Sequence, residues 1–133
     1  MSQNKWDKTN IPSLKDKVII VTGGNSGLGY ESVKAFAGKG ATVILSSRRE
    51  DKGREASDKI REDFPAADIE VMKLDLADLA SVEAFASNFR AGFDRLDILM
   101  NNAGIMTTPY FTTRDGFEGQ MGTNHLGHFA LTL

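Results

Sequence analysis

The sequence predicts an α/β fold in which a parallel β-sheet is covered by helices on both faces. Three observations support this prediction. Strand and helix patterns alternate along the chain in the order βαβαβαβ-loop-α. The first predicted strand, at residues 17–21, is rich in β-branched residues and suits burial on both faces of the sheet. A glycine-rich turn then joins this strand directly to the first helix.

The boundaries of the first two helices carry clear signals. After the glycine turn, a helical pattern continues to about Lys39 and is closed by Gly40. A second helix over residues 50–64 repeats an apolar residue every four positions, as an amphipathic helix does, and Pro65 stops it. The predicted strands cover residues 17–21, 42–45, 69–74 and 96–100.

The second half of the chain is predicted to contain two more helices. Asp78 can cap the first of them, and Gly92 occupies the position expected of its C-cap. After the fourth strand, a loop that contains Gly104 and Pro109 leads to a last apolar helix from about Asp115. These elements complete the predicted alternation.

Composition and charge are typical of one globular domain. Hydrophobic residues make up 41% and charged residues 26% of the 133 positions, and the net charge is −2. A nucleic-acid partner would need a basic stripe, which is absent, and no apolar run approaches the roughly 20 residues of a membrane span. The lack of cysteine and the polar first residues lead us to expect a cytoplasmic protein.

The turn T-G-G-N-S-G-L-G at residues 22–29 predicts a dinucleotide site, the alternative being a tight turn alone. Glycine permits the sharp turn and the close approach of backbone to a pyrophosphate, and a helix N-terminus attracts the phosphates. Because the motif follows a buried strand and opens a helix, we expect a single, partial NAD(P)-binding domain of the Rossmann type over residues 1–133, with residues 1–13 as an N-terminal arm. The residues expected to contact the cofactor here are Gly23, Asn25, Ser26, Gly27, Leu28 and Gly29.

The spacing T-G-x-x-x-G-x-G resembles that of the short-chain dehydrogenase/reductase family, and N-N-A-G directly after the fourth strand agrees with it. The resemblance implies that Asn102, Ala103 and Gly104 lie against the cofactor. The stretch T-N-H-L-G-H-F-A-L-T most closely resembles the branch that contains retinol dehydrogenases and protochlorophyllide reductases. The resemblance extends from about Ile11 to the end of the chain.

The same resemblance implies roles for three further residues. The Asp75 carboxylate and the neighbouring backbone N–H at Leu76 would hold adenine, whereas Asn124 would be the catalytic asparagine that helps to hold a water in a proton relay. His125 and His128 stand three residues apart on the last helix, but no third ligand accompanies them, so we predict no metal.

The end of the second strand predicts NADP. An acidic residue about 20 positions after the first glycine would bind the ribose hydroxyls of NAD. Ser47 stands there instead and Arg48 follows, which suits a phosphate because a guanidinium can bind it through two hydrogen bonds. The alternatives are NAD, bound through Glu50 or Asp51 in a shifted register, and a solvated turn with no ligand.

Tyr30 and Lys34 have the spacing of the family's catalytic Tyr-x-x-x-Lys, but they stand on the first helix, so we interpret them as a surface or packing pair. The family's catalytic serine, tyrosine and lysine have no counterpart here, and the chain ends at Leu133 inside an apolar pattern. We therefore expect the N-terminal, cofactor-binding half of a longer enzyme, truncated after the fourth strand and the helix that follows it.

The predicted function is NADP-dependent hydride transfer between the nicotinamide and a small-molecule carbonyl or alcohol substrate. The alternatives are a dinucleotide-binding module without catalysis and an inactive truncated fragment. Neither the substrate nor the oligomeric state follows from the sequence, and the resemblance allows a homo-oligomer.

Overall fold

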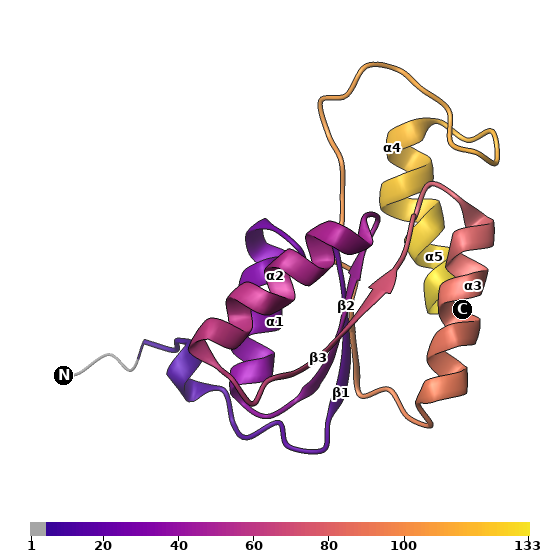
Figure 1. Ribbon diagram of the computed structural model, residues 1–133. Coiled ribbons are helices and arrows are strands. Elements are labelled where there is room, and N and C mark those ends of the chain that lie inside the picture. The colour runs from indigo at the N-terminus through magenta and orange to yellow at the C-terminus, as the bar shows by residue number, and fades with distance from the viewer. Residues whose placement is uncertain (1–4) are drawn as a thin grey trace.

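The computed structural model describes residues 5–133, in which four parallel strands form one sheet. The strands stand side by side in the order β3-β2-β1-β4, so the chain moves outward from β1 to β3 and then crosses to the other side of β1 (Figure 1). Such a reversal of direction creates a crevice beyond the carboxyl ends of the strands. The predicted α/β fold is confirmed. The strands are β1 (Val18–Thr22), β2 (Thr42–Ser47), β3 (Asp68–Lys73) and β4 (Ile98–Met100).

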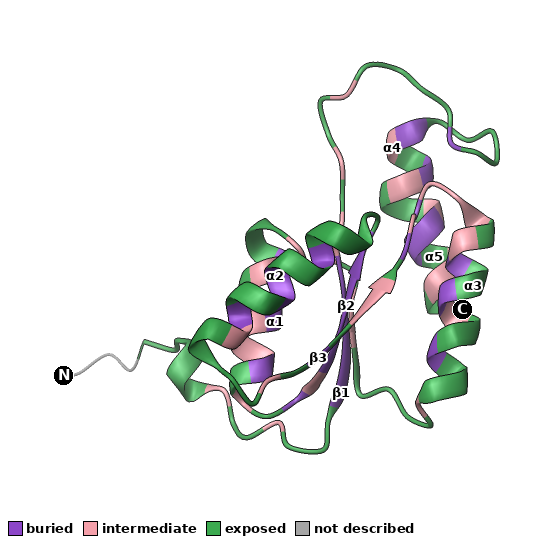
Figure 2. Cartoon of the chain, viewed as in Figure 1, coloured by how far each residue is buried: buried purple, intermediate pink, exposed green. Residues whose placement is uncertain are grey.

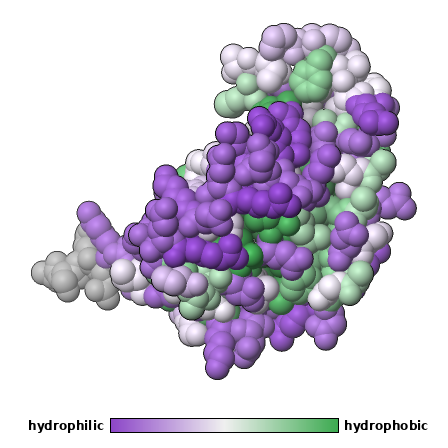
Figure 3. Space-filling model, viewed as in Figure 1, coloured by the Kyte–Doolittle hydropathy of each residue, from purple (hydrophilic) through white to green (hydrophobic). Residues whose placement is uncertain are grey.

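Helices cover both faces of the sheet (Figures 1 and 2). Alternate strand residues face opposite sides, so each face has its own apolar cluster. Figure 3 shows a mainly hydrophilic outer surface over α2, with apolar side chains visible in the middle of the same face. One cluster joins Ile19, Val21, Val43 and Leu45 to α1 (Gly27–Gly38) and α2 (Glu50–Asp63). The other joins Val18, Ile20 and Ile44 to α3 (Leu79–Gly92) and the last helical segment.

Two predicted helix ends are confirmed and one is wrong. Gly40 follows α1 with a φ of 90°, a left-handed conformation that favours glycine, and the Asp78 carboxylate accepts a hydrogen bond from the Ala80 N–H at 3.0 Å. Gly92, however, is the final residue of α3, and the C-cap is Phe93 in an extended conformation. The chain leaves this helix without a left-handed turn, so no glycine is needed at its end.

The last helix starts later than predicted. Asp115 lies outside it, and its carboxylate accepts a hydrogen bond from the Leu79 N–H at 2.8 Å, at the beginning of α3. Glu118 caps the actual helix start through two backbone N–H groups. The segment then runs through α4 (Gly119–Met121), the π-helical turn η2 (Gly122–Leu126) and α5 (Gly127–Thr132).

The fourth strand is also shorter than predicted, because it begins at Ile98, directly after Asp97. The Asp97 N–H donates to the Val18 carbonyl, and the Asp97 carboxylate accepts from the Val18 N–H at 2.8 Å. Of the predicted arm, residues 5–13 lie outside the sheet and contain the short turn η1 (Lys8–Asn10), whereas residues 1–4 fall outside the described part. Within residues 5–133, no helix has the length and apolar character needed to cross a membrane.

Candidate functional site

A cavity of about 550 Å³ lies beyond the carboxyl ends of the strands, where the strand order reverses. Its wall comes from the glycine turn, the end of β2, the segment after β3, the N-N-A-G turn and parts of the final loop and helix. Parallel strands bring these distant motifs together because all their carboxyl ends meet at one edge. The predicted residues that line the cavity are Gly23, Asn25, Ser26, Leu28, Ser47, Arg48, Asp75, Leu76, Asn102, Ala103 and Gly104.

Three predicted residues do not line this cavity. Gly27 borders a second, adjoining hollow between α1 and α2. Gly29 is buried behind the turn, where a Cβ atom would stand 2.5 Å from Asn102 Nδ2 and still closer to the Gly23 carbonyl oxygen. Glycine at this position therefore lets α1 approach the strand ends closely. Asn124 lies on the π-helical turn behind the N-N-A-G segment.

The N-terminus of α1 has no side-chain cap. Ser26 occupies the N-cap position, yet its side chain makes no capping hydrogen bond, and the first bond of the helix runs from the Tyr30 N–H to the Ser26 carbonyl. The N–H groups of the first turn have no acceptor within the helix. Together with the positive end of the helix dipole, they form a site that suits an anion such as a pyrophosphate.

The end of β2 places one unpaired guanidinium at the cavity. Arg48 is exposed there and forms no ion pair with any other residue in the range 5–133. Arg49 instead pairs with Asp51 at 2.7 Å, and its hydrogen bond lowers the pKa of that carboxyl group. Glu50 pairs with Arg54 at 3.0 Å. Both acids that could have served NAD in a shifted register are therefore engaged elsewhere.

Ser47 is buried beside Arg48, and its hydroxyl donates to the Arg49 carbonyl at 2.9 Å. A hydroxyl that donates one hydrogen bond retains lone pairs that can accept others. Lys52 also lines this end of the cavity. Arg49 lines the cavity here as well, so the β2 end combines a buried hydroxyl with three cationic side chains, of which Arg49 is paired with Asp51.

The segment after β3 is shaped by Asp75. Its carboxylate accepts from the Ala77 N–H at 2.9 Å, and its own N–H donates to the Ser81 hydroxyl at 2.9 Å. The N–H of Leu76 has no hydrogen-bond acceptor in the described part of the chain. Leu76 lines the cavity, so its N–H could donate to a ligand there.

Thr22 connects the glycine turn to the N-N-A-G turn, and sequence reasoning assigned it no role. Its hydroxyl oxygen accepts from the backbone N–H groups of Asn102 and Ala103, both at 2.9 Å. The Asn102 side chain donates in return to the Thr22 carbonyl at 3.2 Å. The sequence signal for this role was the threonine that begins the T-G motif, because a hydroxyl at that position can reach the end of the neighbouring strand.

Asn124 is held by the backbone of Ile105. The amide nitrogen donates to the Ile105 carbonyl at 2.7 Å, and the amide oxygen accepts from the Ile105 N–H at 2.8 Å. The side chain therefore joins the π-helical turn to the chain just beyond N-N-A-G. Single π-helical turns occur frequently at functional sites.

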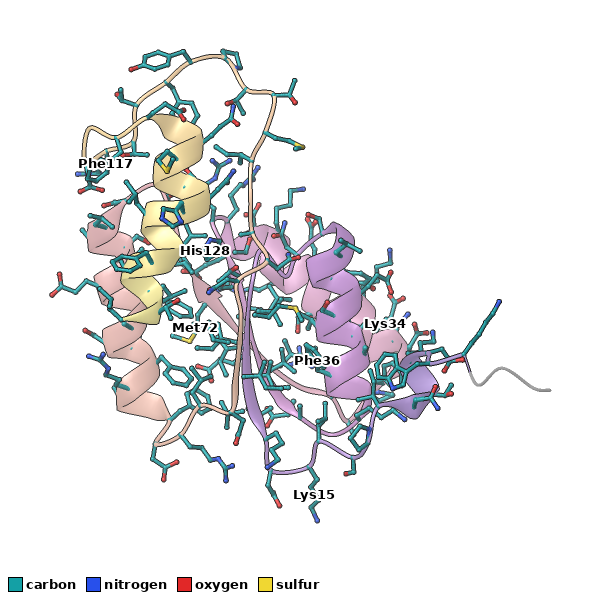
Figure 4. All side chains as sticks on the ribbon, turned by 180° about the vertical axis from the view of Figure 1, so that it is seen from behind. Lys15, Lys34, Phe36, Met72, Phe117 and His128 are labelled. Carbon is teal, nitrogen blue, oxygen red and sulfur yellow. The ribbon has the colours of Figure 1, made fainter. Side chains whose placement is uncertain are left out.

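Tyr30 and Lys34 contact α2, and Tyr30 also packs against the apolar core, which confirms their interpretation as a surface or packing pair. The Lys34 ammonium stands 2.7 Å from the Asp63 carboxylate, and this hydrogen bond raises the pKa of Lys34. The Tyr30 ring lies beneath the Lys59 ammonium, 5.5 Å from it. Lys34 and His128 lie on opposite sides of the sheet (Figure 4).

Known proteins with similar sequences include dehydrogenases. The family described as short chain dehydrogenase matches residues 17–133. Retinol dehydrogenase 12 from Homo sapiens is 46% identical over 125 residues, which are 94% of this chain and 39% of that protein. Retinol dehydrogenase 11 from Mus musculus is 48% identical over 124 residues, 93% of this chain and 39% of that protein. The chain thus spans about two-fifths of the length of these relatives.

Solved structures show the same fold. An uncharacterized protein from Mycobacterium Paratuberculosis has a TM-score of 0.85 and 47% identity, over 96% of this chain and 44% of that one. A short chain dehydrogenase from Escherichia coli CFT073, solved in complex with NADPH, has a TM-score of 0.74 and 30% identity, over 90% of this chain and 52% of that one. A metagenomic short-chain oxidoreductase in complex with NADP has a TM-score of 0.76 and 26% identity, over 90% of this chain and 54% of that one.

Proposed function

Because this chain belongs to the short-chain dehydrogenase family, we propose that it forms the cofactor-binding part of an NADP-dependent oxidoreductase. The observation that carries the choice of NADP is the Arg48 guanidinium, which is exposed at the cavity beside Ser47 and has no carboxylate partner in the described part of the chain. The structures solved with NADP and NADPH are consistent with this choice.

The cavity residues fit the parts of the cofactor. The uncapped start of α1 would hold the pyrophosphate, with Gly23, Asn25, Ser26, Gly27 and Leu28 around it and Gly29 behind. Ser47 and Arg48 would hold the ribose 2′-phosphate. The Leu76 N–H and the Asp75 carboxylate would hold adenine, and Asn102, Ala103 and Gly104 would border the nicotinamide half.

The reaction that this site would serve is hydride transfer to or from a small carbonyl or alcohol. The nicotinamide supplies the hydride chemistry, and the protein supplies binding, orientation and the proton. Asn124 would be the residue of this chain that belongs to the catalytic set. We retain a cytoplasmic location for this enzyme, in keeping with the absence of cysteine.

Replacement of Arg48 by alanine tests the choice of cofactor. Loss of charge-assisted hydrogen bonds to a phosphate, about 1.5–3 kcal/mol, should weaken NADPH binding roughly 10- to 150-fold. NADH binding should change little, because NADH lacks the 2′-phosphate. Both affinities are measured by titration of the purified protein, followed through the fluorescence of the reduced nicotinamide.

Arg49→Ala is the matched control. Arg49 has the same charge and stands next in the chain, but it is already paired with Asp51 at 2.7 Å, so its loss should leave NADPH affinity within a few-fold of the wild type. Equal NADPH affinity in Arg48→Ala and the wild type would overturn the assignment of NADP.

A dinucleotide-binding module without catalysis is the second candidate, because Tyr30 and Lys34, which have the catalytic spacing, contact Lys59 and Asp63 of α2 instead of lining the cavity. Turnover of the whole protein separates the two functions. Oxidation of NADPH in the presence of small aldehydes and ketones supports the oxidoreductase. Tight binding without turnover across such a panel supports the module.

A further inference from the structure

A buried histidine connects the two turns that border the nicotinamide half of the cavity. His128 lies on α5 with 7% of its surface exposed. Its Nε2 stands 2.9 Å from the Thr22 hydroxyl, and its Nδ1 stands 3.0 Å from the Asn124 carbonyl oxygen. Figure 4 places His128 on the helical segment that packs beside the sheet.

The partners of Thr22 determine which ring nitrogen carries the proton. The Thr22 oxygen already accepts two hydrogen bonds, from the N–H groups of Asn102 and Ala103, both at 2.9 Å. A hydroxyl has two lone pairs and one hydrogen, so only the hydrogen remains for another partner. His128 Nε2 at 2.9 Å is a closer acceptor for it than the Met100 carbonyl at 3.4 Å.

Nε2 is therefore the unprotonated nitrogen, and the proton of the neutral ring belongs on Nδ1. From there it donates to the Asn124 carbonyl at 3.0 Å. The opposite tautomer would point an N–H at a hydroxyl with no free lone pair and would leave two acceptors facing each other at Nδ1. A doubly protonated ring would keep the first of these conflicts.

These contacts form a continuous hydrogen-bond network that connects the N-N-A-G turn, Thr22, His128 and Asn124. Thr22 binds the backbone of the N-N-A-G turn, His128 binds Thr22 and the Asn124 carbonyl, and Asn124 binds Ile105 just beyond the same turn. A displacement of the turn would therefore be transmitted to Asn124 through hydrogen bonds. Thr132 strengthens the link, because its hydroxyl donates to the His128 carbonyl at 2.8 Å and accepts from the Asn101 side chain at 3.2 Å.

We propose that His128 is a positioning residue, which as a neutral Nδ1–H imidazole holds Asn124 in register with the N-N-A-G turn. Its role in positioning a cofactor site rests on the proposed function, whereas the tautomer and the register of Asn124 do not. His128 does not itself line the cavity, so it acts through Thr22, which does, and through Asn124.

The tautomer is tested by nitrogen NMR of the imidazole ring in the protein without cofactor. We expect Nδ1 to resonate as a protonated nitrogen coupled to a hydrogen, and Nε2 as an unprotonated one. Loss of the signals in His128→Gln assigns them. A ring protonated on Nε2, or an average of both tautomers, would overturn the proposal.

The positioning role is tested by three variants, each titrated with NADPH and monitored at the Asn124 side-chain amide. His128→Phe keeps a flat ring but removes both hydrogen bonds, and we expect it to shift the Asn124 amide signals and weaken NADPH binding about tenfold. His128→Gln can both donate and accept, so it should recover part of the loss. His125→Gln alters the exposed histidine of the same segment and should change neither reading.

The outcomes separate the two proposals. Unchanged Asn124 signals in a folded His128→Phe variant would refute the positioning role whether or not NADPH binds. Failure of the wild type to bind NADPH would instead refute the proposed function, while the tautomer and the Asn124 signals still decide the role of His128. Where His128→Phe does not fold, Thr22→Val keeps the histidine and removes its hydroxyl partner, together with the acceptor of the Asn102 and Ala103 N–H groups. Unchanged Asn124 side-chain amide signals in that variant would contradict the argument.

Discussion

Gly29 is the residue whose replacement tests the architecture of the glycine turn most directly. In Gly29→Ala the new methyl group would stand 2.5 Å from Asn102 Nδ2 and still closer to the Gly23 carbonyl oxygen, whereas ordinary contacts begin at about 3.4 Å. The Gly23 oxygen belongs to the backbone and cannot rotate away. Either the turn or the start of α1 must therefore move.

The magnitude follows from the contacts that would change. Forced displacement of well-packed groups costs about 1–3 kcal/mol. Retreat of Asn102 would also break its hydrogen bond to the Thr22 carbonyl, at 3.2 Å, which contributes about 1 kcal/mol. Alanine also lowers the backbone entropy of the unfolded chain, which stabilises the folded protein by about 0.4–1 kcal/mol and offsets part of this loss. We expect the free energy of unfolding to fall by about 1–4 kcal/mol.

Urea unfolding of the variant and the wild type measures this difference through the linear extrapolation of the free energy. Gly92→Ala is the control, because a Cβ at the end of α3 would meet nothing within 4 Å. It should leave stability unchanged or raise it by up to about 1 kcal/mol. NADPH affinity should fall in Gly29→Ala only. A Gly29→Ala protein as stable as the wild type would refute the close approach of α1 to the strand ends.

Two further predictions concern α5 and the start of β4. Gly127→Ala would drive a methyl group into the Leu76 carbonyl and to 3.0 Å from Leu76 Cβ, so it should lower the free energy of unfolding by about 1–3 kcal/mol, and an unchanged thermal midpoint would contradict this packing. Hydrogen bonds from Arg95 and then from the Val18 N–H lower the pKa of Asp97 below its ordinary 3.8. Its ionised form therefore stabilises the folded protein above pH 3.8, and this contribution is lost as pH falls through the lower folded pKa. Asp97→Asn should reduce stability at neutral pH and flatten its acid dependence, as measured by unfolding from pH 7 downward; an acid dependence equal to that of the wild type would count against the assignment.

The successes and failures of sequence reasoning follow from the range over which each signal acts. Gly40 and Asp78 were predicted correctly because a cap involves only the neighbouring turn of the chain. Asp115 was placed in a helix by local pattern, but its carboxylate binds the N–H of Leu79, a residue 36 positions earlier. Gly92 was misread because the chain could leave α3 in an extended conformation at Phe93.

The candidate site shows the same contrast between local signals, which the sequence reveals, and long-range contacts, which it does not. The glycine turn, N-N-A-G and the β2 end were found from sequence because each motif is continuous and stands at a strand end. Which basic residue of the β2 end is free was not predictable, since the pairing of Arg49 with Asp51 depends on side-chain geometry. The placement of Asn124 against Ile105 likewise required the chain to pass over the strand ends and return.

The sequence by itself determined the order of strands and helices and the motifs that mark a short-chain dehydrogenase, because periodicity, caps and turns act within a few residues. The tertiary structure alone decided that Arg48 is the arginine of the β2 end without an ion-pair partner among residues 5–133, and that His128 links Thr22 to Asn124. Thr22 and His128 are 106 residues apart, so no local pattern relates them. Their hydrogen bond exists only after the sheet has formed and α5 has packed against it.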